Sequence, residues 1–388
     1  MKLLFICGSS VPTLCGVGKY TDKIANLLVK NNHEVVLIGN KNQKLGKKDG
    51  AEVSYNLIKI DILFKNLFKI FQIIKNERPD VINIQYNSLE FGRSAFPSIL
   101  SVLLKIRFPK IHLQVNIHEF SSYTLLGKIR HIIPTIFADK VFFSDRKQLE
   151  SALLFSRNFI KNKSCIMSLG SVVKYILPDY KPFFSDGKEL HIAFHGLIQL
   201  KNGIEYLLKS LVSLNKQNIR FKLHILGAFQ LLADYGNLNI EIDNYQKDWL
   251  EFIKINLADD VIIYGDVPPD SDLFREVLQK TEICVVPDNE GMTIRRSSFW
   301  NVFMQSQNIM FASFDEYSSD LIFKEFITFK PKNDKSLAQE IVLYSKLTSK
   351  EKMSIWEKQE KVKAIMDIKI IEPEVIKMLT LSKYNIDK

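Results

Sequence analysis

Two adjacent arginines, Arg295 and Arg296, follow a carboxylate–glycine pair, Glu290 and Gly291, in the second half of the chain. An apolar run precedes this polar segment, and a stretch with helical spacing begins at Ser298. The arginines therefore lie between a predicted strand and a predicted helix, where α/β proteins bind ligands. Guanidinium groups beside a helix N-terminus suit a diphosphate, because the helix N–H groups and dipole favour an anion there. The carboxylate suits the hydroxyl groups of a sugar.

A second candidate for phosphate binding is Lys201, which lies between Gly196 and Gly203. This segment follows a strand-like run and leads into a helical pattern that begins at Ile204. An ammonium group at that position could reach a phosphate without opposing the helix dipole. The alternative interpretation is an exposed lysine at the start of a helix.

Near the N-terminus, Gly16 and Gly18 lie between the first predicted strand and the first predicted helix. Glycines there let the backbone approach a phosphate or a sugar closely. The spacing is not Gly-x-Gly-x-x-Gly, because Thr21 occupies the third glycine position. A tight turn without a ligand is the alternative.

His118 directly follows a predicted strand, 112–117, at its carboxyl end. A histidine there can donate a hydrogen bond to a bound sugar or take part in proton transfer, or it can satisfy loop backbone. No cluster of His, Cys, Asp and Glu has metal-ligand spacing, so no metal and no cofactor are expected. The four cysteines include no Cys-x-x-Cys pair, which is typical of a reducing cytoplasm.

Short apolar runs alternate with longer helical patterns along most of the 388 residues, which indicates βαβ units and parallel sheets. Composition shifts to Pro, Asp, Gly and Lys around 178–188, where we place a linker. The sequence predicts an α/β protein with two doubly wound, Rossmann-like domains facing across a cleft. The expected bounds are 1–182, 183–350, and C-terminal helices at 351–388 that pack back toward the first domain.

Basic residues concentrate in the first half, because residues 1–185 carry a net charge of +14 and the remainder −4. This part of the chain is expected to bind an anionic partner, namely a membrane surface, a phosphorylated acceptor or nucleic acid. A predicted basic amphipathic helix at 57–75 suits a membrane interface, or packs on a sheet. No nucleic-acid motif is present, so no nucleic-acid partner is expected. No segment is long enough to span a bilayer. The expected location is cytoplasmic, including a peripheral position on the inner face of the membrane.

The residues above resemble those of a family 4 glycosyltransferase with the GT-B fold. The similarity covers the loop with Gly16 and Gly18, His118, the strand starting at Ala138, the Gly196–Gly203 segment, and Glu290-Gly-Met-Thr-Ile-Arg-Arg-Ser-Ser298. The last segment resembles a subgroup motif of the form acid-Gly-x-Ser-x-Arg-Arg-Gly-Ser.

The resemblance implies that the first domain binds the acceptor and the second a nucleotide-sugar donor. It assigns catalytic roles to His118, Glu290 and Lys201, and donor binding to Gly16, Gly18, Gly196, Lys201, Glu290, Gly291, Arg295, Arg296 and Ser298. Two positions depart from the family pattern. Leu197 replaces an arginine, for which Arg295 or Arg296 could substitute, and Ser298 replaces a second glutamate.

The activity implied is transfer of a sugar, with retention and without a metal, to a glycan or polyprenyl-phosphate-linked acceptor in bacterial surface polysaccharide synthesis. One alternative is a sugar-nucleotide epimerase or hydrolase of the same fold, which would consume donor without an acceptor. Another is a non-catalytic GT-B binding protein, which would bind donor without transfer.

Overall fold

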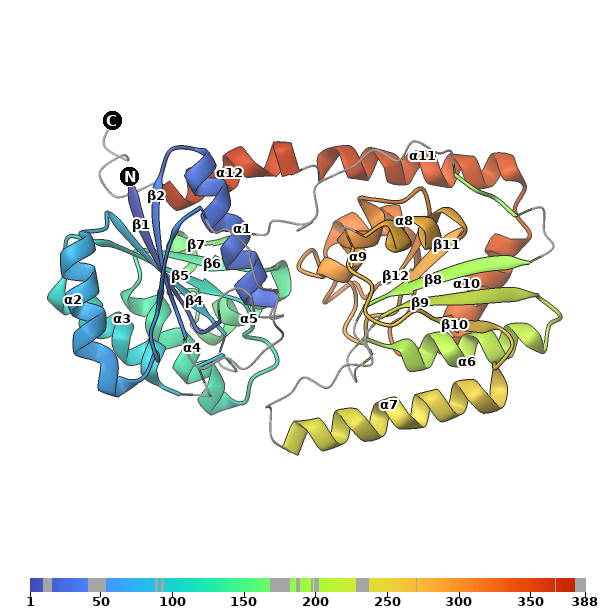
Figure 1. Cartoon of the computed structure of the whole chain (residues 1–388), viewed down its shortest axis with the longest axis horizontal. Coiled ribbons are helices and arrows are strands. Elements are labelled where there is room, and N and C mark those ends of the chain that lie inside the picture. The colour runs from blue at the N-terminus through green and yellow to red at the C-terminus, as the bar shows by residue number, and fades with distance from the viewer. Residues whose placement is uncertain are drawn as a thin grey trace. The chain divides into compact units, whose positions relative to one another are not determined.

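The computed structural model describes residues 1–9, 16–40, 54–87, 90–91, 94–167, 182–185, 189–196, 198, 202–227, 237–269, 271–366 and 368–380. The chain divides into two compact units. Unit 1 comprises Met1–Leu169 with Ile371–Lys388, and unit 2 comprises Gly170–Ile370 (Figure 1).

Unit 1 is built on a seven-stranded sheet in which every described strand pair is parallel. Its order is β3-β2-β1-β4-β5-β6-β7, so the direction of strand addition reverses between β1 and β4. The bounds are β1 (Lys2–Cys7), β2 (Glu34–Gly39), β3 (Asn56–Lys59), β4 (Val81–Tyr86), β5 (His112–Ile117), β6 (Lys140–Phe143) and β7 (Ser164–Ile166). Such a reversal leaves a crevice at the carboxyl ends of the strands.

Helices cover both faces of this sheet, as a buried parallel sheet requires. One face packs against α1 (Gly16–Lys30) and α12 (Ile368–Thr380), so the end of the chain completes the first core. The other face packs against α2 (Leu67–Glu77), α3 (Phe96–Arg107), α4 (Leu125–Phe137) and α5 (Arg146–Phe155). Short 3-10 turns are η1 (Phe64–Asn66) and η2 (Lys161–Lys163).

Unit 2 repeats the plan with six parallel strands in the order β10-β9-β8-β11-β12-β13. The bounds are β8 (Leu190–His195), β9 (Phe221–Leu226), β10 (Val261–Ile263), β11 (Ile283–Val286), β12 (Ile309–Ser313) and β13 (Ile327–Phe329). Here the order reverses between β8 and β11. The loops that leave the carboxyl ends of these two strands are therefore neighbours.

The helices of unit 2 also divide between the two faces of the sheet. On one side lie α6 (Ile204–Asn215), α7 (Asn237–Asn256) and α10 (Asp334–Ser345), and on the other α8 (Asp272–Gln279) and α9 (Ser297–Phe303). A 3-10 turn, η3 (Leu321–Glu325), precedes β13. The long α11 (Ser349–Ile365) contributes to both cores, through Trp356 on one side and Val362 on the other.

The predicted fold class is confirmed, since two parallel α/β sheets are present. The predicted helix at 57–75 is wrong in its first part, because Asn56–Lys59 pairs with β2 as the edge strand β3. The predicted linker at 178–188 lies outside the described residues except for 182–185. None of the helices in the described part of the chain combines the length and apolar composition that a bilayer crossing needs.

Candidate functional site

The loop after β11 is organised around a buried carboxylate, Asp288, whose side chain is 3% exposed. Arg296 forms an ion pair with it, and Asp288 Oδ1 accepts the backbone N–H of Glu290 at 2.8 Å. The Asp288 carbonyl accepts the Ser313 hydroxyl at 2.8 Å, which ties the loop to the end of β12. Burial raises the pKa of Asp288, and Arg296 is the strongest charge that opposes this rise. One arginine of the pair thus holds the loop together.

Glu290 is held by its backbone on both sides. Its N–H donates to Asp288, and its carbonyl accepts the Ser318 hydroxyl at 2.6 Å. Gly291 follows with φ +82°, and a Cβ there would lie 2.5 Å from the Ser319 hydroxyl oxygen. A side chain at 291 would be both strained and obstructed. The half-buried carboxylate of Glu290 therefore projects from a fixed backbone.

The start of α6 approaches this loop closely. Gly203 precedes α6 with φ +70°, and a Cβ on it would lie 1.5 Å from the Pro287 carbonyl oxygen. No residue with a side chain fits between these two backbones. Asn289 Nδ2 adds a hydrogen bond of 3.0 Å to Glu205 on α6. The loops that follow β8 and β11 are thus pressed together at the switch point of the second sheet.

Gly196 and Ser298 also meet at this position. Gly196 directly follows β8 with φ +145°, and a Cβ there would lie 3.4 Å from the Cβ of Ser298. The sequence placed both residues at the donor site, and the structure brings them into contact distance. Leu197 and Lys201 lie outside the described residues, so the role of Lys201 stays a prediction.

Arg295, which is half-buried, directly precedes Arg296, and Ser298 lies two positions after Arg296. Helix α9, which follows, is only seven residues long. Its entry is fixed by Trp300, whose indole N–H donates to the Ile294 carbonyl at 2.8 Å. The Ile294 N–H in turn donates to Asp320 at 2.7 Å. Arg296 forms the ion pair with Asp288, and Arg295 also lowers the pKa of that carboxylate but less strongly, so the two arginines differ in how strongly they act on Asp288.

Buried polar atoms of this loop without a hydrogen-bond partner among the described residues include Thr293 Oγ1 and Arg296 Nε. A buried polar group without a partner costs about 1–3 kcal/mol. Proteins retain such groups mainly where function or a bound molecule explains them.

In unit 1, His118 lies directly after β5 and is 9% exposed. Its Nε2 is 2.8 Å from Gln85 Oε1 on β4, and its ring stands edge-on to Tyr20 of α1, with ring centres 5.2 Å apart. The Ser144 hydroxyl donates to the His118 carbonyl at 2.9 Å. Gln85 and Tyr20 were not predicted from the sequence. The histidine is thus a fixed group at the carboxyl edge of the first sheet.

The two N-terminal glycines belong to the first turn of α1, so the prediction that they precede the first helix is wrong. A Cβ on Gly16 would meet nothing within 4 Å, whereas Gly18 is buried. The residues between Ser9 and Gly16 lie outside the described residues. The predicted role of these glycines in donor binding stays a prediction.

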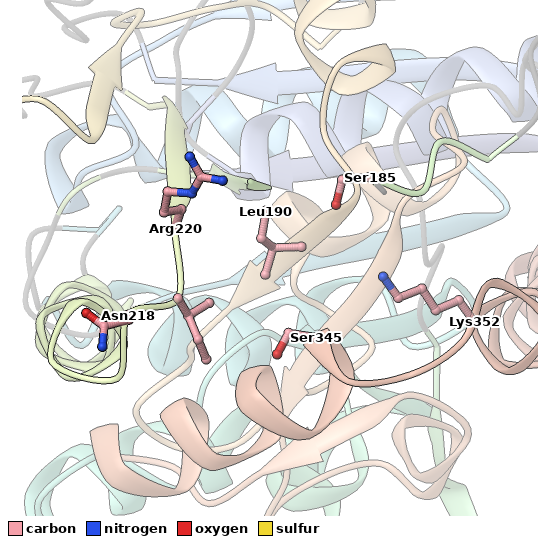
Figure 2. A pocket seen from close by; sticks show the side chains of 7 residues that line it. Ser185, Leu190, Asn218, Arg220, Ser345 and Lys352 are labelled. Carbon is pink, nitrogen blue, oxygen red and sulfur yellow. The ribbon is translucent and has the colours of Figure 1, made fainter. Parts of the chain in front are cut away.

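A cavity of about 260 Å³ lies at the other end of the second sheet (Figure 2). It is lined by residues at the starts of strands and on α10 and α11, namely Ser185, Leu190, Asn218, Ile219, Arg220, Ser345 and Lys352. Lys352 forms a 2.7 Å ion pair with buried Glu282, which also accepts from Ser185 and from the Tyr344 hydroxyl. These contacts satisfy the carboxylate and fasten α11 to the sheet. The cavity is therefore separate from the candidate site.

Comparisons with known proteins agree with the architecture. No family model matches the sequence, and no curated protein sequence matches it. Solved structures match at nearly full length. A glycosyltransferase from Rickettsia africae ESF-5 has a TM-score of 0.68 at 14% identity, covering 98% of this chain and 99% of the other.

Two further solved structures show the same similarity. Sucrose-phosphate synthase from Thermosynechococcus elongatus has a TM-score of 0.67 at 14% identity, covering 97% of this chain and 98% of the other. The Anabaena protein HepE, in complex with UDP and glucose, has a TM-score of 0.67 at 12% identity, covering 98% and 99%. With two parallel-sheet units of seven and six strands, this chain has the GT-B fold.

Proposed function

We propose that this protein is a glycosyltransferase that moves a sugar from a nucleotide-sugar donor to a glycan or polyprenyl-phosphate-linked acceptor. The observation that carries the proposal is the convergence of Gly196, Gly203 and the Glu290–Ser298 loop at the switch point of the second sheet. Ligands of open α/β sheets bind at such points. The glycosyltransferase of Rickettsia africae and the UDP-bound HepE have the same fold, which supports the choice of donor class.

Each residue has a distinct role in this proposal. Glu290 accepts hydrogen bonds from hydroxyls of the donor sugar. Arg295 and Lys201 neutralise the diphosphate as it leaves, which is where negative charge develops in the transition state. Arg296 acts through Asp288, keeping Glu290 and Arg295 in place. None of these roles requires a metal. We propose that transfer occurs with retention and belongs to bacterial surface polysaccharide synthesis.

The donor assignment is tested by calorimetric binding of UDP and other nucleoside diphosphates. Arg295→Met should weaken binding at least about tenfold, because one charge-assisted hydrogen bond contributes roughly 1.5–3 kcal/mol. Arg220→Met is the matched control, since Arg220 is an exposed arginine of the same unit at the opposite end of the sheet. Unchanged binding in Arg295→Met, or an equal loss in Arg220→Met, would remove the diphosphate assignment.

Catalysis is tested by release of nucleoside diphosphate from a panel of sugar nucleotides. We expect release only when membranes or polyprenyl-linked glycans are added. Release without an acceptor would instead favour the hydrolase alternative, and binding without release under any condition would favour the non-catalytic one.

The surface of unit 1 supports an acceptor held at a membrane. Helices α2, α3 and α4 lie on one face of the sheet, where α3 packs beside α4 and Phe71 of α2 contacts Phe108 after α3. Large apolar side chains on their outer sides are strongly exposed, among them Phe68 (83%), Ile106 (71%), Leu125 (66%) and Leu126 (67%). Lys65, Lys69, Arg107 and Lys110 are also exposed and lie close to Phe68 or Ile106 in the sequence.

Apolar side chains between basic ones are suited to an anionic bilayer surface, where each lysine or arginine contributes about 1 kcal/mol. We propose that this apolar–basic face docks on the inner surface of the membrane. Cosedimentation with vesicles that contain phosphatidylglycerol should fall at least about fivefold in Leu125→Glu/Leu126→Glu. Ile255→Glu, on α7 of unit 2, changes an equally exposed side chain (71%) and should have no effect. Equal binding to neutral vesicles would contradict the proposal.

A further inference from the structure

A continuous chain of buried side-chain amides crosses the first sheet on the face covered by α1 and α12. Gln114 donates to the Leu379 carbonyl at 2.9 Å, and Asn83 donates to Gln114 Oε1 at 3.1 Å. Gln85 donates to Asn83 Oδ1 at 2.7 Å. His118 Nε2 then lies 2.8 Å from Gln85 Oε1. Asn83, Gln85 and Gln114 lie on β4 and β5, His118 directly follows β5, and all four side chains are at most about a tenth exposed. We call Leu379 and these four side chains the amide ladder.

The direction of every bond in the ladder follows from its end. The Leu379 carbonyl belongs to the last turn of α12 and can only accept. Gln114 must therefore present its NH₂ group to Leu379 and its oxygen to Asn83. Asn83 must then present its NH₂ group to Gln114 and its oxygen to Gln85. The NH₂ group of Gln85 therefore faces Asn83, and its oxygen faces His118. The Asn116 NH₂ group also donates to this Gln85 oxygen, at 3.2 Å, so the orientation of Asn116 follows from that of Gln85.

The histidine is the last member, and its protonation follows. A carbonyl-type oxygen beside Nε2 requires a proton on Nε2, so the neutral ring carries its lone pair on Nδ1. We propose that Gln85 is a positioning residue that holds His118 in the Nε2–H tautomer, and that the C-terminal helix α12 sets this orientation through the amide ladder.

This inference rests on the proposed function for its consequence. With Nδ1 unprotonated, the neutral His118 ring could accept but not donate a hydrogen bond at that atom. That differs from the donor role considered from the sequence. It also gives α12 a part in positioning His118, because the Gln114 side chain bonds to Leu379 of α12, 265 positions further along the chain.

The ladder also explains why amides occupy these positions at all. Residues 83 and 85 on β4 and residues 114 and 116 on β5 face the same side, because side chains alternate along a strand. Apolar residues there would cover the sheet without leaving any buried polar atom to satisfy. A hydrogen-bonded polar network instead favours one arrangement, and here that arrangement ends at His118.

The test uses ¹⁵N-histidine NMR of the full-length protein, which separates protonated from unprotonated ring nitrogens. The His118 signals are assigned with His118→Gln. In the wild type we expect a protonated Nε2 and an unprotonated Nδ1. A dominant Nδ1–H tautomer would overturn the proposal directly, with or without any observed sugar transfer.

Gln114→Met probes the far end of the ladder. It should release Asn83 and Gln85 to rotate, so the His118 Nδ1–H population should rise at least about threefold. Gln148→Met is the matched control. Gln148 is equally buried in unit 1 and accepts from the N–H groups of Phe120 and Ser121, close to His118 in sequence but outside the ladder. An unchanged tautomer in Gln114→Met, or an equal change in the control, would refute the ladder.

If Gln114→Met does not fold, Gln85→Glu gives a second test. A carboxylate facing Nε2–H should keep the tautomer and shift the titration of His118 upward by about one pH unit or more. The absence of an upward shift would show that Nε2 does not face residue 85. These measurements need no substrate. They can therefore refute the amide ladder without refuting the proposed glycosyltransferase activity, and a failure of that activity would not refute the ladder.

Discussion

The Asp288–Arg296 pair gives the sharpest test of how the candidate donor loop is held. Arg296→Met removes the partner of a carboxylate that is 3% exposed. Breaking a buried ion pair from one side costs about 3–5 kcal/mol, because the remaining charge is left buried. Arg296 itself is 22% exposed, so we expect the lower end, about 3 kcal/mol. For a unit of this size that corresponds to a fall in melting temperature of about 6–12 °C.

Tryptophan fluorescence measures this effect selectively, since all three tryptophans, Trp249, Trp300 and Trp356, belong to unit 2. Trp300 also bonds to the Ile294 carbonyl, so its emission reports on the loop. The double variant Asp288→Asn/Arg296→Met should recover at least half of the loss. An asparagine removes the buried charge and still accepts the Glu290 N–H.

The pH dependence of the loss provides an independent check. The pKa of Asp288 is already raised by burial, and Arg296 is the strongest charge lowering it. Without Arg296 that pKa should rise further, so the native state would hold its proton more tightly than the unfolded state. The destabilisation of Arg296→Met should therefore be large near pH 7.5 and shrink toward pH 5. A loss below about 1 kcal/mol at pH 7.5, or one equal at both pH values, would refute this account of the loop.

Two further predictions concern unit 2. Gly203→Ala should lower its melting temperature much more than Gly265→Ala. Both glycines have similar φ angles, +70° and +80°, but a Cβ at 265 meets nothing within 4 Å and one at 203 collides with Pro287. Similar losses in thermal unfolding would mean that the loops do not approach as described. Burial is the main cause that lowers the pKa of His224 to about 4, and the nearby His191 is the next. The unfolded state therefore binds a proton on His224 below about pH 6.5, whereas the native state does so only near pH 4. Stability should fall by about 3 kcal/mol as the pH drops from 6.5 to 4, and His224→Gln should remove that part of the fall. Tryptophan fluorescence measures this loss of stability. If His224→Gln loses as much stability in acid as the wild type, His224 is not its cause.

The alternation of apolar runs and helical patterns was sufficient to predict the two parallel sheets. Buried parallel strands such as β1, β8 and β11 are short continuous apolar runs, which the sequence displays directly. The strands that the pattern missed, β7 and β13, have three residues each. Runs so short carry little periodicity, although β10, which also has three residues, overlaps a strand predicted at 261–264. The edge strand β3 was read as helix because Leu57 and Ile58 continue without a break into the apolar residues of α2.

The candidate site was predicted only in part, because its geometry depends on the paths of separate loops. Glu290, Gly291 and Arg295 were assigned to the candidate site from residue type and position, and their roles stay predictions. The inequality of the two arginines was not predicted, since it depends on Asp288 being buried beneath the loop. A signal for Asp288 existed, as it directly follows Pro287 at the end of a strand. The amide ladder also left a signal, because Asn83 and Gln85 alternate with isoleucines in an otherwise apolar strand.

The location of the bound donor tests the central claim most directly. We would crosslink an azido-nucleoside diphosphate to the full-length protein with light and identify the modified peptides by mass spectrometry. The account predicts modification within residues 195–204 or 286–298, reduced by excess unmodified nucleotide and by Arg295→Met. Modification confined to the amino ends of the strands, around Arg220 and Lys352, or only to unit 1, would contradict it.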